Sequence, residues 1–206
     1  WDLPDALQAN GGWANRETVH RFAEYAQGIQ ARMGDRLVSI ATHNEPWVMA
    51  VLGHETGIFA PGIKSRSTAA QVSHHLLLSH GLAVQALRAQ GSKAKLGIVL
   101  NLSPMHPATA SAADEAKARL EDGRLLRWYM DPLFKASYPQ DVLDDLGEDG
   151  PQIQASDLKN IAVPIDFLGV NYYSRSVVSA DNSWKPGSSG HEVTEMDWEV
   201  YPKGLT

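Results

Sequence analysis

Cysteine is absent from this 206-residue sequence, which excludes disulfide bonds and thiolate metal sites. Long hydrophobic runs are also absent, since no segment approaches the roughly 18 uninterrupted apolar residues of a membrane span. Basic residues are the minority, with 18 Lys and Arg against 24 Asp and Glu and a net charge of −6. Nucleic acids and anionic membranes favour a basic protein face. We therefore expect a cytoplasmic protein that binds neither nucleic acid nor a membrane.

The two ends of the sequence do not look like the ends of a complete protein. The first residue is Trp1 rather than Met, and no basic segment followed by an apolar one comes after it. The last residues, 201–206, carry no terminating pattern. The composition, 43% apolar and 20% charged, suits an ordinary globular unit. We expect residues 1–206 to be part of one domain within a longer chain.

Helical and strand-like periods alternate along the sequence. Apolar residues at helical spacing from Val19 to Met33 predict a helix that Gly34 ends. Two further helices are expected at about 67–91 and 111–130, and Asp131-Pro132 should stop the second of these. Short apolar runs predict strands at residues 37–42, 96–100 and 165–170.

Nearly continuous apolar strands that alternate with helices indicate parallel β/α units. Three strands are too few for a closed eight-stranded barrel, which takes about 250 residues. The pattern is therefore compatible with a small open sheet or with part of a barrel.

Polar side chains follow each of the three predicted strands: Asn44-Glu45, Asn101 and Asn171-Tyr172-Tyr173. Barrel and open-sheet enzymes carry their active sites at the carboxyl ends of parallel strands. Glycoside hydrolysis needs such a mixture, because carboxyl groups perform the chemistry and amides can both donate to and accept from sugar hydroxyls. Aromatic rings offer flat apolar faces to the sugar.

Four blocks, in order along essentially the whole chain, resemble glycoside hydrolase family 1, the retaining β-glycosidases that include β-glucosidases. The blocks are Trp1-Asp2-Leu3-Pro4 with Gly11-Gly12-Trp13-Ala14-Asn15-Arg16, Thr42-His43-Asn44-Glu45-Pro46, Phe167-Leu168-Gly169-Val170-Asn171-Tyr172-Tyr173, and Met196-Asp197-Trp198-Glu199-Val200-Tyr201-Pro202. The resemblance implies an α/β fold, namely the central portion of a (β/α)8 TIM barrel. It would run from the third strand end to the loop before the seventh strand, so that residues 1–206 are a partial catalytic domain.

The resemblance implies hydrolysis of terminal β-D-glucosyl or related residues with retention, by a double displacement between two carboxylates. Glu45 would be the general acid that protonates the glycosidic oxygen and then the base that activates water. The expected substrate-binding residues are Asn44 at the sugar 2-hydroxyl, Asn171 and Tyr173 near the nucleophile, Trp1 near the sugar, and Trp47 and Leu52 on the leaving-group side. The expected partner is a β-linked oligosaccharide or β-glucoside. No metal or organic cofactor is expected, because carboxylates supply both proton transfer and nucleophilic attack.

The family's nucleophile lies in an Ile-Thr-Glu-Asn-Gly-like block, and no Glu of this sequence is followed by Asn-Gly. Thr194-Glu195 looks similar, but Met196-Asp197 follows it and no apolar strand precedes it. We interpret it as part of the loop before the seventh strand. The chain is thus expected to carry the acid/base without the nucleophile and to be inactive alone.

Three alternatives remain open. The first is a non-catalytic sugar-binding relative, and the second is a 6-phospho-β-glycosidase of the same family. The third is an unrelated open α/β domain in which Asn44-Glu45 only caps a helix.

Histidines could suggest a metal site, but their spacing does not. His74, His75 and His80 lie on one predicted helix without a His-Glu-x-x-His pattern, so we interpret them as bonded helix histidines. His43 is expected to pack or bond at the barrel rim. It should point away from Thr42, because neighbouring strand residues face opposite sides.

Overall fold

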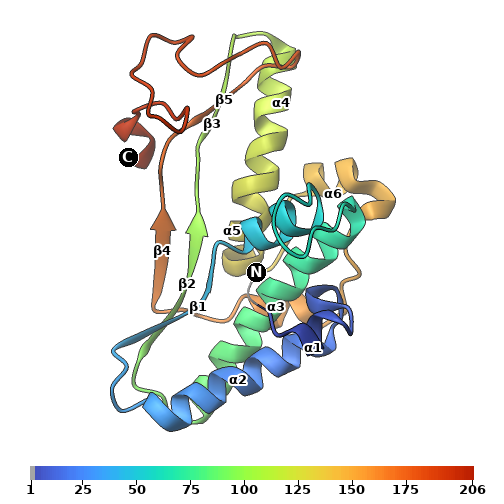
Figure 1. Ribbon diagram of the computed structural model, residues 1–206, viewed down its shortest axis with the longest axis vertical. Helices are drawn as coiled ribbons and strands as arrows, with labels where there is room; N and C mark the ends of the chain where they lie inside the picture. Colours follow the sequence, from blue (N-terminus) through green and yellow to red (C-terminus); the bar gives the residue numbers. More distant parts are fainter. Residues whose placement is uncertain (1–2) are drawn as a thin grey trace.

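The computed structural model describes residues 3–206 and has an α/β fold built on a parallel sheet (Figure 1). Trp1, expected near the sugar, lies outside the described residues. The elements, in order, are α1 (Asp5–Gln8), η1 (Gly12–Ala14), α2 (Glu17–Met33), β1 (Ser39–Asn44), η2 (Val48–Leu52), α3 (Arg66–Ala89), β2 (Lys95–Asn101), β3 (Met105–Pro107), α4 (Ala112–Asp122), η3 (Gly123–Arg127), α5 (Trp128–Lys135), α6 (Gln140–Leu146), η4 (Gly147–Asp149), α7 (Asp157–Ile161), β4 (Phe167–Asn171), β5 (Ser176–Val178) and η5 (Pro202–Leu205).

The main sheet has three parallel strands in the order β1-β2-β4. β2 lies in the centre and is largely buried, whereas β1 and β4 contain no fully buried residue. The register of β2 against β4 ends with Asn101 opposite Asn171. Because all three strands run the same way, their carboxyl ends meet at one edge of the sheet. The short parallel pair β3-β5 continues from that edge (Figure 1).

The long helix α3 connects the sheet to the other helices. Ser65 caps its first turn by accepting a hydrogen bond from the Thr68 N–H at 3.2 Å. Most of its residues from Ala69 to Leu87 are buried, because α3 packs against α2, α7 and the strands. Gly81 allows the close approach of α7, since a Cβ at this position would lie 1.9 Å from the Asn160 carbonyl oxygen.

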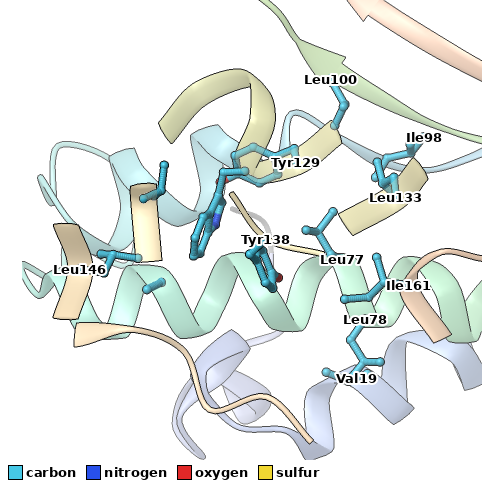
Figure 2. Close-up of a cluster of buried hydrophobic side chains, with 13 residues drawn as sticks. Val19, Leu77, Leu78, Ile98, Leu100, Tyr129, Leu133, Tyr138, Leu146 and Ile161 are labelled. Carbon is cyan, nitrogen blue, oxygen red and sulfur yellow. The ribbon is translucent and has the colours of Figure 1, made fainter. Parts of the chain in front are cut away.

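The hydrophobic core lies between α3, β2 and α5. Figure 2 shows Leu77 of α3, Ile98 and Leu100 of β2 and Leu133 of α5 directed into one cluster, and Tyr129 joins them. All five side chains are buried. Removing this much apolar surface from water is the main favourable term for this part of the fold.

A buried ion pair fastens the amino-terminal segment to α3 and α7. The Asp157 carboxylate is fully buried and accepts two hydrogen bonds from Arg16. His74 of α3 lies 3.0 Å from the same carboxylate, and its other ring nitrogen lies 2.9 Å from the Tyr138 hydroxyl. Burial alone would raise the pKa of Asp157, but the bonds from Arg16, the Gln154 N–H and His74 outweigh it and hold the pKa well below its ordinary value.

One sequence-based element prediction needs correction. Asp131-Pro132 does not end the third predicted helix, which passes through the π-helical turn η3 and continues as α5 to Lys135. Pro132 and Leu133 are buried there, so tertiary packing outweighs the lost backbone hydrogen bond. The acidic residues Asp144 and Asp145 lie on the next helix, α6.

The helices within residues 3–206 include none with both the length and the apolar content of a membrane-spanning segment.

Candidate active site

The residues after the parallel strands form one constellation. The side-chain amide of Asn171, the last residue of β4, donates to Glu45 Oε1 at 2.7 Å and to Asn44 Oδ1 at 3.0 Å. The structure therefore brings together three of the residues that the sequence singled out, although 126 positions separate Glu45 from Asn171.

Glu45 owes its position to an irregularity in β1. Between Ala41 and Asn44 the strand uses three steps, whereas its partner β2 uses two from Gly97 to Val99. Such a bulge changes the face to which the following side chains point. Glu45 itself has a positive φ of 51°, uncommon for a residue other than glycine, while its N–H still donates to the Val99 carbonyl at 2.9 Å. Bulges and left-handed non-glycine residues are concentrated at functional sites.

Both residues inside the bulge hydrogen-bond to α3. Thr42 Oγ1 lies 2.7 Å from His80 Nδ1, and His43 Nε2 lies 2.8 Å from Ser79 Oγ. His43 also stacks on the Phe22 ring, with centroids 4.3 Å apart. The expectation that His43 bonds rather than catalyses agrees with this placement, but the expectation that it points away from Thr42 is wrong. The bulge breaks the strict alternation on which that expectation depended.

A cleft of about 390 Å³ opens at this edge of the sheet. Its lining combines Glu45 and Asn171 with further polar, apolar and aromatic side chains, among them Val48, Leu52, Asn101, Tyr173, Arg175 and Trp198. The Tyr173 ring is 60% exposed and lies 5.1 Å from that of Trp198. Glu45 is the only carboxylate among the described residues that line this cleft.

Trp47 and Leu52 lie on opposite faces of the segment that follows Glu45. Leu52 faces the cleft together with Val48. Trp47 and Val51 face a second cavity of about 320 Å³, and Trp47 packs against the main hydrophobic core. Trp47 is therefore not among the residues that line the cleft of Glu45.

Arg175, which lines the cleft, forms an ion pair with Glu199. Arg175 donates from Nε to the buried Glu199 carboxylate at 2.7 Å, and its guanidinium lies 4.2 Å from the centre of the Tyr201 ring. Burial alone would raise the pKa of Glu199, but bonds from Ser189 and Arg175 outweigh it and lower the pKa. Glu199 is thus held as an anion that neutralises Arg175.

Sequence reasoning missed several residues of this site, notably Ser79, Arg175 and Trp198, and it interpreted His80 only as a bonded helix histidine. Arg175 lies two residues beyond the block that ends in Tyr173, and Trp198 belongs to the fourth block, so both carried a signal. Ser79 carried none, because it lies on a helix that is distant in the sequence.

The three histidines of α3 bond to protein groups. No group of three or more His, Cys, Asp and Glu suited to a metal occurs in residues 3–206. His74 and His80 have the partners described above, and His75 Nδ1 lies 2.8 Å from the Trp13 carbonyl oxygen. Burial lowers the pKa of His80 to about 4 and is the main cause that lowers that of His43 to about 3.

Parallel β/α units that present a carboxylate, amides and aromatic rings at one edge place the chain among α/β proteins whose functional sites lie at the carboxyl ends of parallel strands. The family model of glycosyl hydrolase family 1 matches residues 1–206. The chain belongs to glycosyl hydrolase family 1.

Relatives with curated functions are similar over the whole length of the chain. β-Glucosidase A of Acetivibrio thermocellus is 44% identical, and the chain covers 48% of that protein. A 6-phospho-β-glucosidase of Bacillus subtilis is 34% identical, with 48% covered. The chain thus spans about half the length of the curated relatives it matches.

Solved structures agree in fold. The AHE enzyme from Alicyclobacillus herbarius superposes with a TM-score of 0.93 at 44% identity, and the match covers the whole chain and 48% of that structure. The virulence factor SghA of Agrobacterium tumefaciens, determined with its substrate analogue salicin, gives a TM-score of 0.89 at 37% identity, with 47% covered.

Proposed function

We propose that this chain is the part of a retaining β-glucosidase that carries the acid/base. Glu45 protonates the glycosidic oxygen in the first displacement and activates water in the second. The observation that carries the proposal is the placement of Glu45 in the cleft, with Asn171 Nδ2 2.7 Å from its carboxylate.

The geometry supports this role in two ways. An acid/base must reach a substrate oxygen, and Glu45 lines an open cleft rather than a closed core. The Asn171 amide fixes the carboxylate while Asn44, held by the same amide, is available for a sugar hydroxyl. Tyr173 and Leu52 line the space beside it, and we assign them to substrate binding. Trp1 is assigned to the sugar on the resemblance alone. The same resemblance assigns Trp47 to the leaving-group side, whereas in this structure Trp47 lines the neighbouring cavity.

The nucleophile is a residue other than the described ones that line this cleft. A double displacement needs a second carboxylate about 5 to 5.5 Å from the first, and Glu45 has no such neighbour among the cleft residues of the described chain. Glu195 lies exposed in a turn between Thr194 and Trp198, whose backbone groups bond at 2.9 Å. We infer a segment from the third strand end to the loop before the seventh strand of a (β/α)8 barrel, inactive by itself.

A neutral β-glucoside fits the cleft better than a phosphorylated sugar. Arg175 is the only cation among the described lining residues, and Glu199 already neutralises it. The similarity to a 6-phospho-β-glucosidase keeps that substrate as the second candidate. The substrate class taken from the relatives is therefore a β-glucoside or β-linked glucose oligosaccharide.

The test compares Glu45→Gln with Glu195→Gln in a complete catalytic domain that contains this chain. Glu45→Gln should lower kcat/KM for phenyl β-glucoside by about 100-fold or more, because general acid catalysis contributes about 10²–10⁴-fold. Glu195→Gln, the matched control, should leave the rate unchanged. Equal activity of the two variants would refute the assignment. If the unmodified domain hydrolyses nothing and Glu45→Gln only weakens its binding of the sugar, the protein would be a non-catalytic relative.

A further inference from the structure

We propose that Ser79 and His80 of α3 are positioning residues for Glu45, which they hold in place by anchoring the bulge in β1. The inference rests on the proposed acid/base role of Glu45 and adds to it the device that aims the carboxylate. Neither residue lines the cleft, so both act through Thr42 and His43.

His80 ties three elements together at the start of the bulge. Its Nδ1 lies 2.7 Å from Thr42 Oγ1, and Thr42 Oγ1 lies 3.3 Å from the Gly97 carbonyl oxygen of β2. A carbonyl can only accept, so all three groups are satisfied when His80 donates to Thr42 and Thr42 donates to Gly97. Gly97 pairs with Ala41, the last regular position before the bulge.

Ser79 holds the second bulge residue. Its hydroxyl donates to the Leu76 carbonyl oxygen at 2.8 Å and can therefore accept from His43 Nε2 at 2.8 Å. The His43 ring is further confined between Phe22, at 4.3 Å, and Trp13, at 5.5 Å between ring centroids. Thr42 and His43, the two bulge residues of β1, are thus hydrogen-bonded to neighbouring residues of α3.

The anchors matter because Glu45 is only two residues beyond His43. A non-glycine residue with φ near 51° is unfavourable and persists only where its surroundings fix it. If the bulge relaxed, β1 could return to regular pairing, which would move the side chain of Glu45 to another face. A displacement of about 1 Å is enough to lower a rate by about 100-fold.

His80 also leaves one buried polar atom without a hydrogen bond within residues 3–206, which is unfavourable for stability. It is almost wholly buried, and its Nε2 has no hydrogen-bond partner among the described residues. An apolar side chain of similar shape would avoid this unsatisfied atom. The imidazole is therefore better explained by what its Nδ1 does at Thr42 than by a contribution to stability.

The experiment uses a complete catalytic domain containing this chain and two substrates that differ in their need for an acid. A 2,4-dinitrophenyl leaving group departs with little protonation, whereas a phenyl group needs it. Misplacing Glu45 should therefore lower kcat/KM for phenyl β-glucoside about tenfold more than for the dinitrophenyl compound. A general loss of folded enzyme lowers both equally.

The variants come in matched pairs. Thr42→Val and His80→Leu remove the bond and should show the selective loss, while Thr42→Ser keeps the hydroxyl and His80→Asn keeps an N–H near the Nδ1 position, so both should behave like the parent. Ser79→Ala tests the second anchor with a minimal change in volume. If His80→Leu does not fold, Thr42→Val and Ser79→Ala decide the matter.

Equal losses on both substrates, or no loss in Thr42→Val and Ser79→Ala, would overturn the positioning role. Glu45→Gln is measured alongside to separate this outcome from a failure of the proposed function. If that variant also lacks the selective loss on phenyl β-glucoside, the acid/base assignment itself is wrong.

Discussion

The amide of Asn171 bridges to Glu45, with Nδ2 2.7 Å from Oε1, and thereby links the last residue of β4 to the residue that follows β1. Removing this donor in Asn171→Ala frees the carboxylate to rotate and also removes the bond to Asn44. We expect kcat/KM to fall by about 10- to 100-fold, since one well-placed donor in an active site is worth about that much or more. Steady-state kinetics on an aryl β-glucoside, with the melting temperature as a control for folding, provide the check. An unchanged kcat/KM would show that Asn171 does not hold Glu45 during catalysis.

The presence of the three strands could be predicted from the sequence, but their relationship to the site could not. Apolar runs placed β2 and β4 within two residues of their observed limits. β1 was displaced by two residues, because its polar end, Thr42 to Asn44, does not read as a strand. The bulge could not be predicted from the alternation of apolar and polar residues, because it interrupts that alternation. Its position depends on contacts with α3, which lies far away in the sequence.

In the candidate site, too, the residues could be predicted from the sequence but their contacts could not. Asn44, Glu45 and Asn171 could be selected because they follow strands, and parallel strands end at one edge. The contact of Asn171 with Glu45 depends on the order β1-β2-β4 and on a left-handed backbone at Glu45, neither of which local propensities determine. The positions of Trp47 and Leu52 depend on the faces of a single irregular helical turn, η2, which sequence spacing did not resolve.

Gly81 and Gly28 make a matched test of helix packing. Both lie inside helices, but a Cβ at Gly81 would come within 1.9 Å of the Asn160 carbonyl oxygen, whereas at Gly28 it would meet only the flexible Arg32 side chain at 3.4 Å. Gly81→Ala should therefore destabilise the domain by more than about 2 kcal/mol, through a backbone clash between α3 and α7. Gly28→Ala should leave stability unchanged or raise it by up to about 1 kcal/mol.

Urea unfolding of the two variants measures the difference. Equal stability would mean that α7 moves away from α3 at little cost, contrary to the buried contact between them.

Substitution of Asp157 should lower the free energy of unfolding more than substitution of an exposed charged residue. The Asp157 side chain is fully buried, so Asp157→Asn leaves Arg16 and His74 without their anion. Breaking a buried pair in this way costs about 3 kcal/mol or more. The exposed pair of Arg21 with Glu24 is the control, because Glu24→Gln should have no measurable effect. Chemical denaturation compares the two, and a small loss in Asp157→Asn would indicate that the cluster is easily hydrated.

The buried His80 and the partly buried His43 predict how stability depends on pH. Burial holds the pKa of His80 at about 4 and, together with the nearby His80, that of His43 at about 3, while an unfolded histidine titrates near 6.5. Below pH 6.5 the unfolded chain therefore binds protons that the folded chain does not. Stability should be full above pH 7 and fall towards pH 4, by up to about 1.4 kcal/mol per pH unit for each histidine.

Unfolding free energies at pH 7, 6 and 5 check the sign. His80→Asn should make the dependence shallower, because the titrating group is gone. Constant stability from pH 7 to pH 5 would show that the fold does not hold these rings in the neutral form.

The most direct measurement of the acid/base role of Glu45 is azide rescue of Glu45→Gln in the complete catalytic domain, with 2,4-dinitrophenyl β-glucoside as substrate. This variant can still form the covalent intermediate with an activated leaving group, but it lacks the base that activates water. Azide needs no base and attacks the intermediate from the face that water would use. The account predicts that azide restores turnover and that the product is β-glucosyl azide, identified by NMR. An α-glucosyl azide would make Glu45 the nucleophile, and the absence of any rescue would contradict its role as the acid/base.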